Sequence, residues 1–370
     1  MASLTRGDLQ VDDNDEGAAP PVMTRRTTSV RRLVALGVSL ALLTACGGGG
    51  LEIAWTSEPV GTTYAPAAVY ALTDPGESAA SMSQLAALPA VDGLAYRARW
   101  RDLEPTEGVY DWTTLDAAFD AVRGKRLTVH IGVSGGAWPD WLARAGAVTY
   151  GFAGPLGRVT DPLPWDAVFL NRYDNFVAAL AAHVRGRGDM GSLNAISVGA
   201  PVSEMSLLGC QNNLLGGFAY SRTSYLSAWA STIGSHRDRF GAARILVSAP
   251  VGVICQPDND GSAFYSAVMT AARAAGGNVA IFVADLNALG SSRAGQLDPA
   301  LRRQFELHLQ TIWSATNDPG HRMAGSLQDA VCQGLRLGAG YFELYKSDLS
   351  SADAAIRRAI DSARTGRGCP

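Results

Sequence analysis

Residues 94–133 read LAYRARWRDLEPTEGVYDWTTLDAAFDAVRGKRLTVHIGV, and this stretch contains one complete strand–helix–strand unit. Its two apolar runs, Leu94–Trp100 and Leu127–Val133, show little polar alternation, which is typical of strands buried on both faces of a parallel sheet. Between them, Thr114–Val122 has apolar side chains three and four positions apart, a spacing that predicts an amphipathic helix. The unit therefore predicts a parallel α/β fold.

The same alternation continues along the rest of the chain. Six further apolar runs are expected to be strands: Ala67–Leu72, Ala195–Val198, Ile245–Ala249, Val279–Ala284, Arg322–Leu327 and Tyr341–Tyr345. Five further stretches with helical spacing are expected to be helices: Asn175–His183, Tyr225–Ile233, Phe264–Arg273, Arg302–Trp313 and Ala352–Ala363. Eight strands, most of them followed by a helix, in roughly 300 residues predict a single (β/α)8 TIM barrel over residues 66–370. A doubly wound open sheet is the alternative fold, although no GxGxxG loop supports it.

The N-terminal segment differs in composition from the rest. An arginine-rich stretch, residues 25–32, precedes an almost wholly apolar run, Leu33–Leu43, which has the length of a signal-peptide core and is too short to span a bilayer. The sequence Leu-Thr-Ala-Cys then ends at Cys46 and resembles the lipobox read by lipoprotein signal peptidase. We expect residues 1–46 to be an N-terminal extension with a signal peptide, and residues 47–65 to be a glycine-rich linker and N-terminal segment.

This interpretation makes Cys46 the lipidated first residue of the mature protein. The protein is then expected in the cell envelope, lipid-anchored at the outer face of the membrane or in the periplasm. A plain secretory signal with a chance cysteine is the alternative.

The charge balance argues against nucleic acid as a partner. The chain has 31 Lys+Arg against 34 Asp+Glu, a formal net charge of -3, so it has no basic excess to neutralise phosphates. The hydrophobic share of 47% is that of an ordinary globular protein with a large core.

Five cysteines are present, and if Cys46 carries lipid, four remain in an oxidising compartment. Three pairings are open. We favour Cys210–Cys255, because both would lie in neighbouring loops at one end of the barrel, and Cys332–Cys369, which would tie the seventh helix to the C-terminal tail. No pair has CxxC spacing and the histidines are scattered, so we expect neither a metal nor an organic cofactor.

In a (β/α)8 barrel the chemistry is carried by residues at the C-terminal ends of the strands. This rule selects Arg97 and Arg99 after the second expected strand, and Trp138 and Trp141 after the third, whose flat faces could stack on sugar rings. The remaining candidates for substrate binding follow the later strands: Asp285, Asn287, Gln328 and Tyr345.

Two blocks of sequence resemble a known group of enzymes. Residues 96–112 read YRARWRDLEPTEGVYDW and are followed by Leu115 and Asp116. Further on, Gly124–Lys125 leads into an apolar run and then Trp138–Leu142, WPDWL. Both blocks are similar to beta-galactosidase-like and cellulase-like glycoside hydrolases, and they cover some fifty residues in the expected order. The resemblance implies a (β/α)8 barrel that hydrolyses O-glycosidic bonds of an oligo- or polysaccharide, and we expect the chain to be monomeric.

The resemblance also implies a pair of catalytic carboxylates. It places the acid/base on a Glu just beyond the fourth strand, and Glu204 matches that position. It places the nucleophile at the end of the seventh strand, where the sequence has Gln328 followed by Asp329. Glu343, an isolated carboxylate in the apolar eighth strand, is therefore the first candidate for the second role, ahead of Asp285 and Asp329.

A catalytically inactive barrel that binds glycan at the cell surface is the main alternative, because the expected strand-seven Glu is missing. A solute-binding lipoprotein is a third reading, but such proteins have two lobes, and the continuous eightfold alternation argues against it. No GxSxG motif supports a serine hydrolase.

Overall fold

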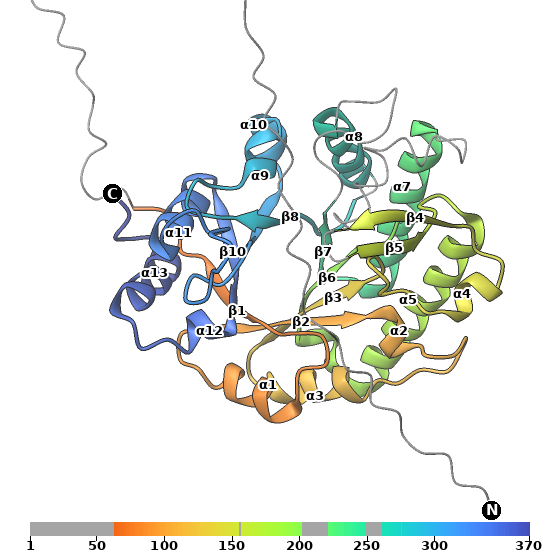
Figure 1. Cartoon of the computed structure of the whole chain (residues 1–370), viewed down its shortest axis with the longest axis horizontal. Coiled ribbons are helices and arrows are strands. Elements are labelled where there is room, and N and C mark those ends of the chain that lie inside the picture. The colour runs from red at the N-terminus through yellow and green to blue at the C-terminus, as the bar shows by residue number, and fades with distance from the viewer. Residues whose placement is uncertain (1–62, 155–156, 202–220, 249–260, 275) are drawn as a thin grey trace, which may run out of the picture. The chain divides into compact units, whose positions relative to one another are not determined.

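The computed structural model describes residues 63–154, 157–201, 221–248, 261–274 and 276–370. Eight parallel strands form a closed barrel in the order β1-β10-β9-β8-β7-β6-β3-β2 (Figure 1). Their bounds are β1 (Ala68–Leu72), β2 (Gly93–Arg99), β3 (Arg126–Gly132), β6 (Leu193–Ser197), β7 (Arg244–Val247), β8 (Val279–Leu286), β9 (Glu306–Thr311) and β10 (Ala339–Tyr345). Because β1 pairs in parallel with both β2 and β10, the ring is complete. The predicted (β/α)8 barrel is confirmed, and the open sheet is excluded.

Long helices cover the outside of the barrel (Figure 1). They are α1 (Ala79–Ala86), α3 (Thr113–Ala121), α5 (Ala167–Arg187), α7 (Arg222–Phe240), α8 (Gly261–Ala274), α11 (Leu327–Arg336) and α13 (Ala354–Thr365). Shorter helices lie in the connections: α2 (Trp100–Leu103), α4 (Trp141–Arg144), α9 (Ser292–Gln296), α10 (Pro299–Arg302) and α12 (Lys346–Leu349), with a 3-10 turn at Asp189–Gly191. None of the helices in the described part of the chain is long and apolar enough to cross a lipid bilayer.

One element was not expected. An antiparallel hairpin of β4 (Thr149–Gly154) and β5 (Gly157–Pro162) lies between β3 and α5 in the chain. It belongs to the connection that leaves the C-terminal end of β3, so it is part of the face where a barrel of this kind carries its chemistry.

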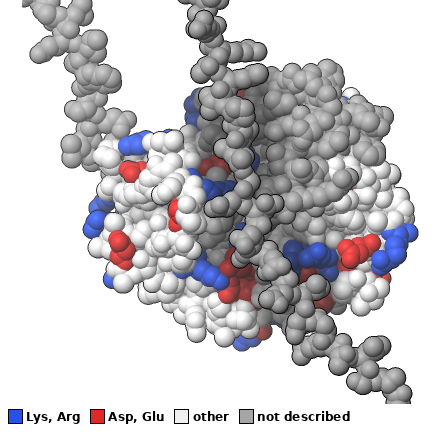
Figure 2. All heavy atoms as spheres, in the orientation of Figure 1, with Lys and Arg blue, Asp and Glu red and all other residues white. Residues whose placement is uncertain are grey.

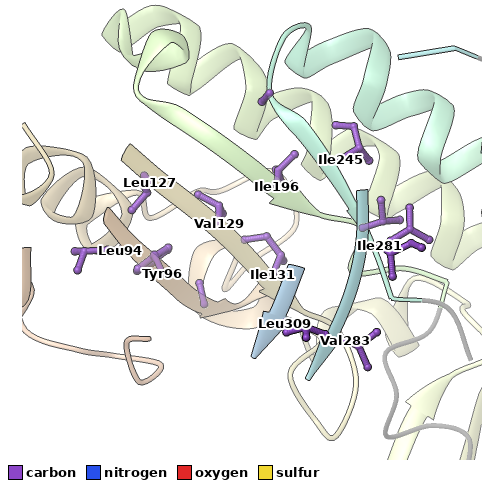
Figure 3. Packing of buried hydrophobic residues seen from close by; sticks show 14 of the residues in the cluster. Leu94, Tyr96, Leu127, Val129, Ile131, Ile196, Ile245, Ile281, Val283 and Leu309 are labelled. Atoms are coloured by element: carbon purple, nitrogen blue, oxygen red, sulfur yellow. The ribbon is translucent and has the colours of Figure 1, made fainter. Parts of the chain in front are cut away.

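The hydrophobic core lies mainly between the sheet and the helices. Alternate strand residues such as Leu94, Val129 and Ile281 point outward and are buried (Figure 3). The opposite set points into the barrel, where small apolar clusters around Tyr70 and Leu246 share the space with polar side chains. The strands thus bury both faces, which is why their sequences lack simple polar alternation.

The seventh strand does not lie at residues 322–327, where it was predicted. Residues 322–327 are not a strand, because Ala324 has a φ of 53° and Ser326 caps the start of α11. The strand is β9, which falls inside the stretch 302–313 that we expected to be a helix. In β9 the polar His308 and Gln310 alternate with Leu307 and Leu309, a period of two that an apolar-run criterion does not detect.

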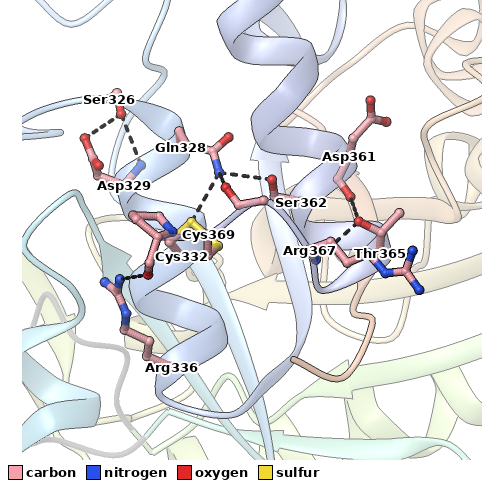
Figure 4. Close-up of a disulfide and its surroundings, with 12 residues drawn as sticks. Ser326, Gln328, Asp329, Cys332, Arg336, Asp361, Ser362, Thr365, Arg367 and Cys369 are labelled. Atoms are coloured by element: carbon pink, nitrogen blue, oxygen red, sulfur yellow. Dashed lines mark hydrogen bonds between the residues drawn. A yellow bond between two sulfur atoms is a disulfide. The ribbon is translucent and has the colours of Figure 1, made fainter. Parts of the chain in front are cut away.

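The C-terminal segment is held to the barrel in two ways. The predicted disulfide Cys332–Cys369 is confirmed, and it joins α11 to the tail that follows α13 (Figure 4). In addition, the Tyr64 amide donates to the Gly366 carbonyl at 2.8 Å, just before β1 begins. Cys210 and Cys255 lie outside the described residues, so their pairing stays a prediction.

The charged side chains of the face seen in Figure 2 are of both signs and interspersed. This mixture agrees with the near-neutral formal net charge of -3.

Candidate active site

Glu343 is a fully buried carboxylate inside the barrel. It lies on β10 with no exposed surface. Its Oε1 atom lies 2.6 Å from His130 Nε2 and 2.9 Å from the Tyr341 hydroxyl. Its Oε2 atom is buried and has no hydrogen-bond partner within the described residues. Because an unpaired buried carboxylate oxygen is costly, Oε2 is the atom to which a bound molecule or water would donate a hydrogen bond.

Two other strands contribute to this arrangement. His130 comes from β3, which lies three strands away from β10 around the ring, so its contact with Glu343 crosses the barrel interior. The His130 ring is tilted against Phe282 of β8 at a centroid distance of 4.8 Å, and its side chain is 12% exposed. The His130 imidazole therefore lies between Glu343 and the Phe282 ring.

Tyr341 connects Glu343 to the residues below it. Its hydroxyl lies 2.9 Å from Thr128 Oγ1, which in turn accepts a hydrogen bond of 3.2 Å from the Asn194 amide. Burial, followed by the charge of Glu343, raises the pKa of Tyr341 well above its usual value. Tyr341 therefore stays a neutral hydroxyl that can donate to the carboxylate.

The lower part of the interior is an ion-paired layer. Glu306 of β9 accepts from Arg244 Nε, and its other oxygen lies 3.4 Å from His308 Nε2. Burial alone would raise the pKa of Glu306, but His308 and Arg244 outweigh it and lower the pKa to about 2. Burial lowers the pKa of His308, whose ring is stacked 4.2 Å from that of Tyr341. The Glu306 carboxylate is thus paired with Arg244, although both ring nitrogens of His308 are buried without a hydrogen bond among the described residues.

The two predicted arginines lie at the C-terminal end of β2. Arg97 Nε donates to the Thr73 carbonyl at 2.7 Å, and its Nη2 pairs with Asp74 at 3.1 Å. Arg99 is 41% exposed and pairs with Asp102 at 2.6 Å. Arg97 is therefore fixed at the mouth of the barrel, whereas Arg99 belongs to the surface of the following short helix.

The correction to strand seven moves the end of that strand. In the observed register, Gln310 of β9 is the partner of Glu343 on β10. Gln310 is 9% exposed, and its amide cannot serve as a carboxylate nucleophile. The absence of a Glu at the end of the seventh strand therefore holds for the true strand as well.

Gln328 was predicted to lie at the barrel mouth after the seventh strand, and this prediction is wrong. It lies on α11, where its amide donates to Ser362 Oγ at 3.0 Å and to the Gly368 carbonyl at 3.2 Å (Figure 4). Asp329 is bonded to Ser326 at the start of the same helix. Gln328 also lies 3.2 Å from Cys332 Sγ, so it packs beside the disulfide on the outside of the barrel.

The aromatic residues after β3 are largely buried. Trp141 is 6% exposed, its indole donates to the Glu104 carbonyl at 3.0 Å, and its ring packs edge-on against Trp100 at 5.8 Å. This burial favours a structural role for Trp141. Trp138 is 9% exposed and donates to the Thr160 carbonyl of the β4–β5 hairpin at 2.7 Å, so it anchors that hairpin, and its contact with substrate stays a prediction.

Glu104, in the distinctive block of sequence, is also explained by packing. Its carboxylate accepts from the Trp100 indole at 2.7 Å and from the Gly108 amide at 2.8 Å. Burial raises its pKa, which those two donors partly offset. The block therefore builds the wall of the barrel mouth.

Asp285 and Asn287 shape the connection after β8. Asp285 accepts from the Ser291 hydroxyl and from the Arg293 amide, the latter at 3.1 Å, at the start of α9. Asn287 accepts from the Leu289 amide at 2.9 Å in a tight turn. These bonds give both residues a local structural role beside the mouth.

Tyr345 ends β10 above Glu343, and its ring lies 6.1 Å from that of Trp313. Trp313, two residues beyond β9, is partly buried and was missed by the sequence analysis because the strand before it was misplaced. His130 was missed as well, although a polar residue at an inward position of an apolar strand was a detectable signal.

Several predicted residues lie outside the described residues. Glu204 follows β6 by seven positions, and Cys46 belongs to the N-terminal segment. Among the residues that the structure does describe, no group of three His, Cys, Asp or Glu side chains is arranged to hold a metal ion.

Comparison with known proteins bears on the class of fold. The catalytic domain of beta-amylase from Paenibacillus polymyxa superposes with a TM-score of 0.56 and 12% identity, covering 82% of this chain and 100% of that one. An exo-beta-1,4-mannosidase from Opitutaceae bacterium strain TAV5 gives a TM-score of 0.46 and 15% identity over 82% and 56% of the two chains. Endo-glycoceramidase II from Rhodococcus sp. superposes with a TM-score of 0.46 and 16% identity, covering 77% of this chain and 73% of that one. The chain is therefore a TIM barrel, as the first of these shows.

A family model gives the finer indication. Residues 83–147 match the beta-galactosidase model of glycoside hydrolase family 42. The matched segment runs from α1 through β2 and β3 to α4, and it contains both blocks that carried the resemblance. No individual curated protein matches the chain. The chain is a (β/α)8 barrel similar to the glycoside hydrolases.

Proposed function

We propose that the protein is a glycoside hydrolase that cleaves O-glycosidic bonds of an extracellular or envelope polysaccharide, with Glu343 and Glu204 as its carboxylates. The observation that carries the proposal is the Glu343 side chain, buried inside the barrel with one oxygen held by two donors and the other without a partner. The family match over residues 83–147 supports the same class of chemistry.

The geometry suggests how the two roles divide. His130 and Tyr341 bind Oε1 of Glu343, which orients the carboxylate and leaves Oε2 to act. In a retaining reaction, Oε2 attacks the anomeric carbon while Glu204 gives its proton to the leaving oxygen. Water then takes the place of Glu343 as Glu204 removes the proton from that water. In an inverting reaction, Oε2 instead removes a proton from the water that attacks.

The location of this activity follows from the N-terminal segment. Lipidation of Cys46 would hold the barrel at the outer face of the cell membrane or in the periplasm, where envelope and extracellular polysaccharides are accessible. Incorporation of labelled palmitate, and its loss in Cys46→Ser, tests the anchor. Unchanged labelling of the variant would contradict it.

The activity itself is tested with the full chain, purified in detergent, on β-linked polysaccharides and aryl glycosides. We expect hydrolysis that falls by about a thousandfold or more in Glu343→Gln and in Glu204→Gln. Glu107→Gln is the matched control, because Glu107 is 47% exposed and pairs with Arg172 on the surface. Turnover that survives in either active-site variant would remove that residue from the mechanism.

A second candidate is a barrel that binds glycan without cleaving it. Gln310 favours this reading, because an amide stands at the end of the seventh strand beside Glu343. The same panel distinguishes the two functions. A glycan that binds, is not cleaved, and binds equally well to Glu343→Gln would establish the binding protein.

A further inference from the structure

A cationic and aromatic cluster lies at the barrel mouth, formed by Arg97, Trp313, Arg322 and Tyr345. The four residues come from the ends of β2, β9 and β10 and from the loop that follows β9. The rings of Trp313 and Tyr345 are 6.1 Å apart, and the Arg322 guanidinium lies 4.7 Å from the centre of the Trp313 ring. Because β9, β10, β1 and β2 are consecutive in the ring, these residues occupy one sector of the mouth.

Arg322 is the cation in this cluster that is not neutralised. Its side chain is exposed, and within the described residues its guanidinium forms no ion pair or hydrogen bond, only the contact with Trp313. Arg97, by contrast, is paired with Asp74. Burial raises the pKa of the Tyr345 hydroxyl, and the charges of Arg97 and Arg322 both oppose that rise.

The loop that carries Arg322 is held firmly. The Asp318 carboxylate accepts from the backbone amides of Arg322 and Met323, at 2.8 and 2.7 Å. Asp348, which is fully buried, accepts from the Thr316 amide at 2.8 Å. These bonds hold the backbone of the loop on both sides of Arg322, so the loop itself needs no ordering when a ligand binds.

We propose that this cluster binds a negatively charged sugar residue, with the acidic group on Arg322 and the sugar ring against Tyr345 and the part of Trp313 that Arg322 leaves uncovered. The inference rests on the proposed function, since it names the class of glycan that the site takes. A guanidinium presents paired donors that match the oxygens of a carboxylate or sulfate group. A neutral sugar would use the aromatic rings and leave Arg322 without a counter-charge.

Binding to the full chain is measured by calorimetry at low salt with paired 4-nitrophenyl glycosides. The pairs are β-glucuronide with β-glucoside, β-galacturonide with β-galactoside, and 6-sulfo-β-galactoside with β-galactoside. The Glu343→Gln background prevents turnover during the titration. In at least one pair we expect the anionic member to bind about tenfold more tightly. The pair that shows it tells a carboxylate from a sulfate.

Three variants separate charge from stacking. Arg322→Gln should bring the two members of that pair within about twofold without weakening the neutral one, whereas Trp313→Ala should weaken both together. Arg358→Gln, on the exposed surface of α13, is the matched control and should change neither. Thermal unfolding of each variant checks that the fold is kept.

The proposal is overturned if no anionic member binds, if the members of every pair bind equally, or if the preference survives in Arg322→Gln. Hydrolysis of neutral glycosides without an anionic preference would leave the proposed function standing and remove this inference. Binding of an anionic glycoside that depends on Arg322, with no substrate cleaved, would support this inference and remove the proposed hydrolase function.

Discussion

The lower and upper parts of the barrel interior each contain a carboxylate, and the two are held differently. Glu306, at the bottom, is 36% exposed, binds Arg244 through one oxygen and lies near His308 with the other. Glu343, near the mouth, is fully buried, and one of its oxygens has no partner among the described residues. The more accessible carboxylate is satisfied, and the inaccessible one is not.

This difference in hydrogen bonding indicates which of the two carboxylates is the better candidate for a functional role. In a paired carboxylate such as Glu306, the ion pair offsets the cost of burial, so a structural role is enough to account for the residue. Glu343 retains an unsatisfied atom at the end of the barrel where such folds carry out chemistry. Four substitutions test how far this distinction holds.

The largest effect is expected from exchanging the two carboxylates for amides. Glu343→Gln should reduce kcat by about a thousandfold with little change in melting temperature, because the amide fits the same space. Glu306→Gln should retain activity within about threefold, because it lies at the opposite end of the barrel. Steady-state kinetics on whichever glycoside is cleaved, with melting curves, provide the measurement. Equal losses of activity would end the contrast between the two layers.

Asp161 tests whether an unpaired buried oxygen is by itself a sign of function. Its Oδ1 accepts from the Gly135 amide at 2.7 Å, and its Oδ2 has no partner in the described structure. Burial raises its pKa to about 6 from 3.8, so its contribution to stability is present below pH 3.8 and is lost as the pH rises through about 6.

Asp161→Asn should therefore raise the free energy of unfolding by about 2 kcal/mol at about pH 8, and by almost nothing at about pH 3.5. Urea unfolding at the two pH values checks this. A stabilised variant with normal kinetics would make Asp161 a structural residue, whereas lost activity would place the β4–β5 hairpin in the site.

Tyr341 is the link between the two layers. Tyr341→Phe removes the donor to Glu343 and should lower kcat by about tenfold, the usual effect of losing one hydrogen bond to a charged group. The KM should change little, because the Tyr341 hydroxyl is engaged by Thr128 and Glu343 and not by a substrate group. If KM rises while kcat stays constant, Tyr341 does not act through Glu343.

The smallest effect concerns the pH dependence of the lower pair. The pKa of Glu306 is lowered to about 2 from 4.5, so its stabilisation is present above pH 4.5 and is lost as the pH falls toward 2. We expect Glu306→Gln to cost about 1 kcal/mol at neutral pH, a value reduced by solvent screening of a half-exposed pair. The difference in the free energy of unfolding between the variant and the parent should become smaller in acid. A difference that does not change with pH would contradict the lowered pKa of Glu306.

The sequence predicted the barrel because seven of its strands are rich in apolar residues and most of them lack regular polar alternation, as in β1 and β8. It failed at β9, where inward-facing Glu306, His308 and Gln310 gave the strand the polar content of a surface helix. The compensating partners of those residues, Arg244 and Tyr341, are distant in sequence, so no local pattern could reveal them.

The site was predicted only in part for the same reason. Glu343 was found because a lone carboxylate in an apolar run is conspicuous. Its partner His130 lies 213 positions away in the chain, and only ring closure brings the two together. For Trp138 and Trp141, the sequence shows that a tryptophan follows a strand but does not show how deeply the indole is buried, so their contact with substrate stays a prediction.

The first and last residues of the barrel domain are in contact, and this has a consequence for the order of its strands along the chain. The Tyr64 amide bonds to the Gly366 carbonyl, and the disulfide fixes the tail that follows. A short linker could therefore join these ends, and the chain could be opened instead at the exposed turn around Gly124. The resulting circular permutant would have new termini and the same closed ring of strands.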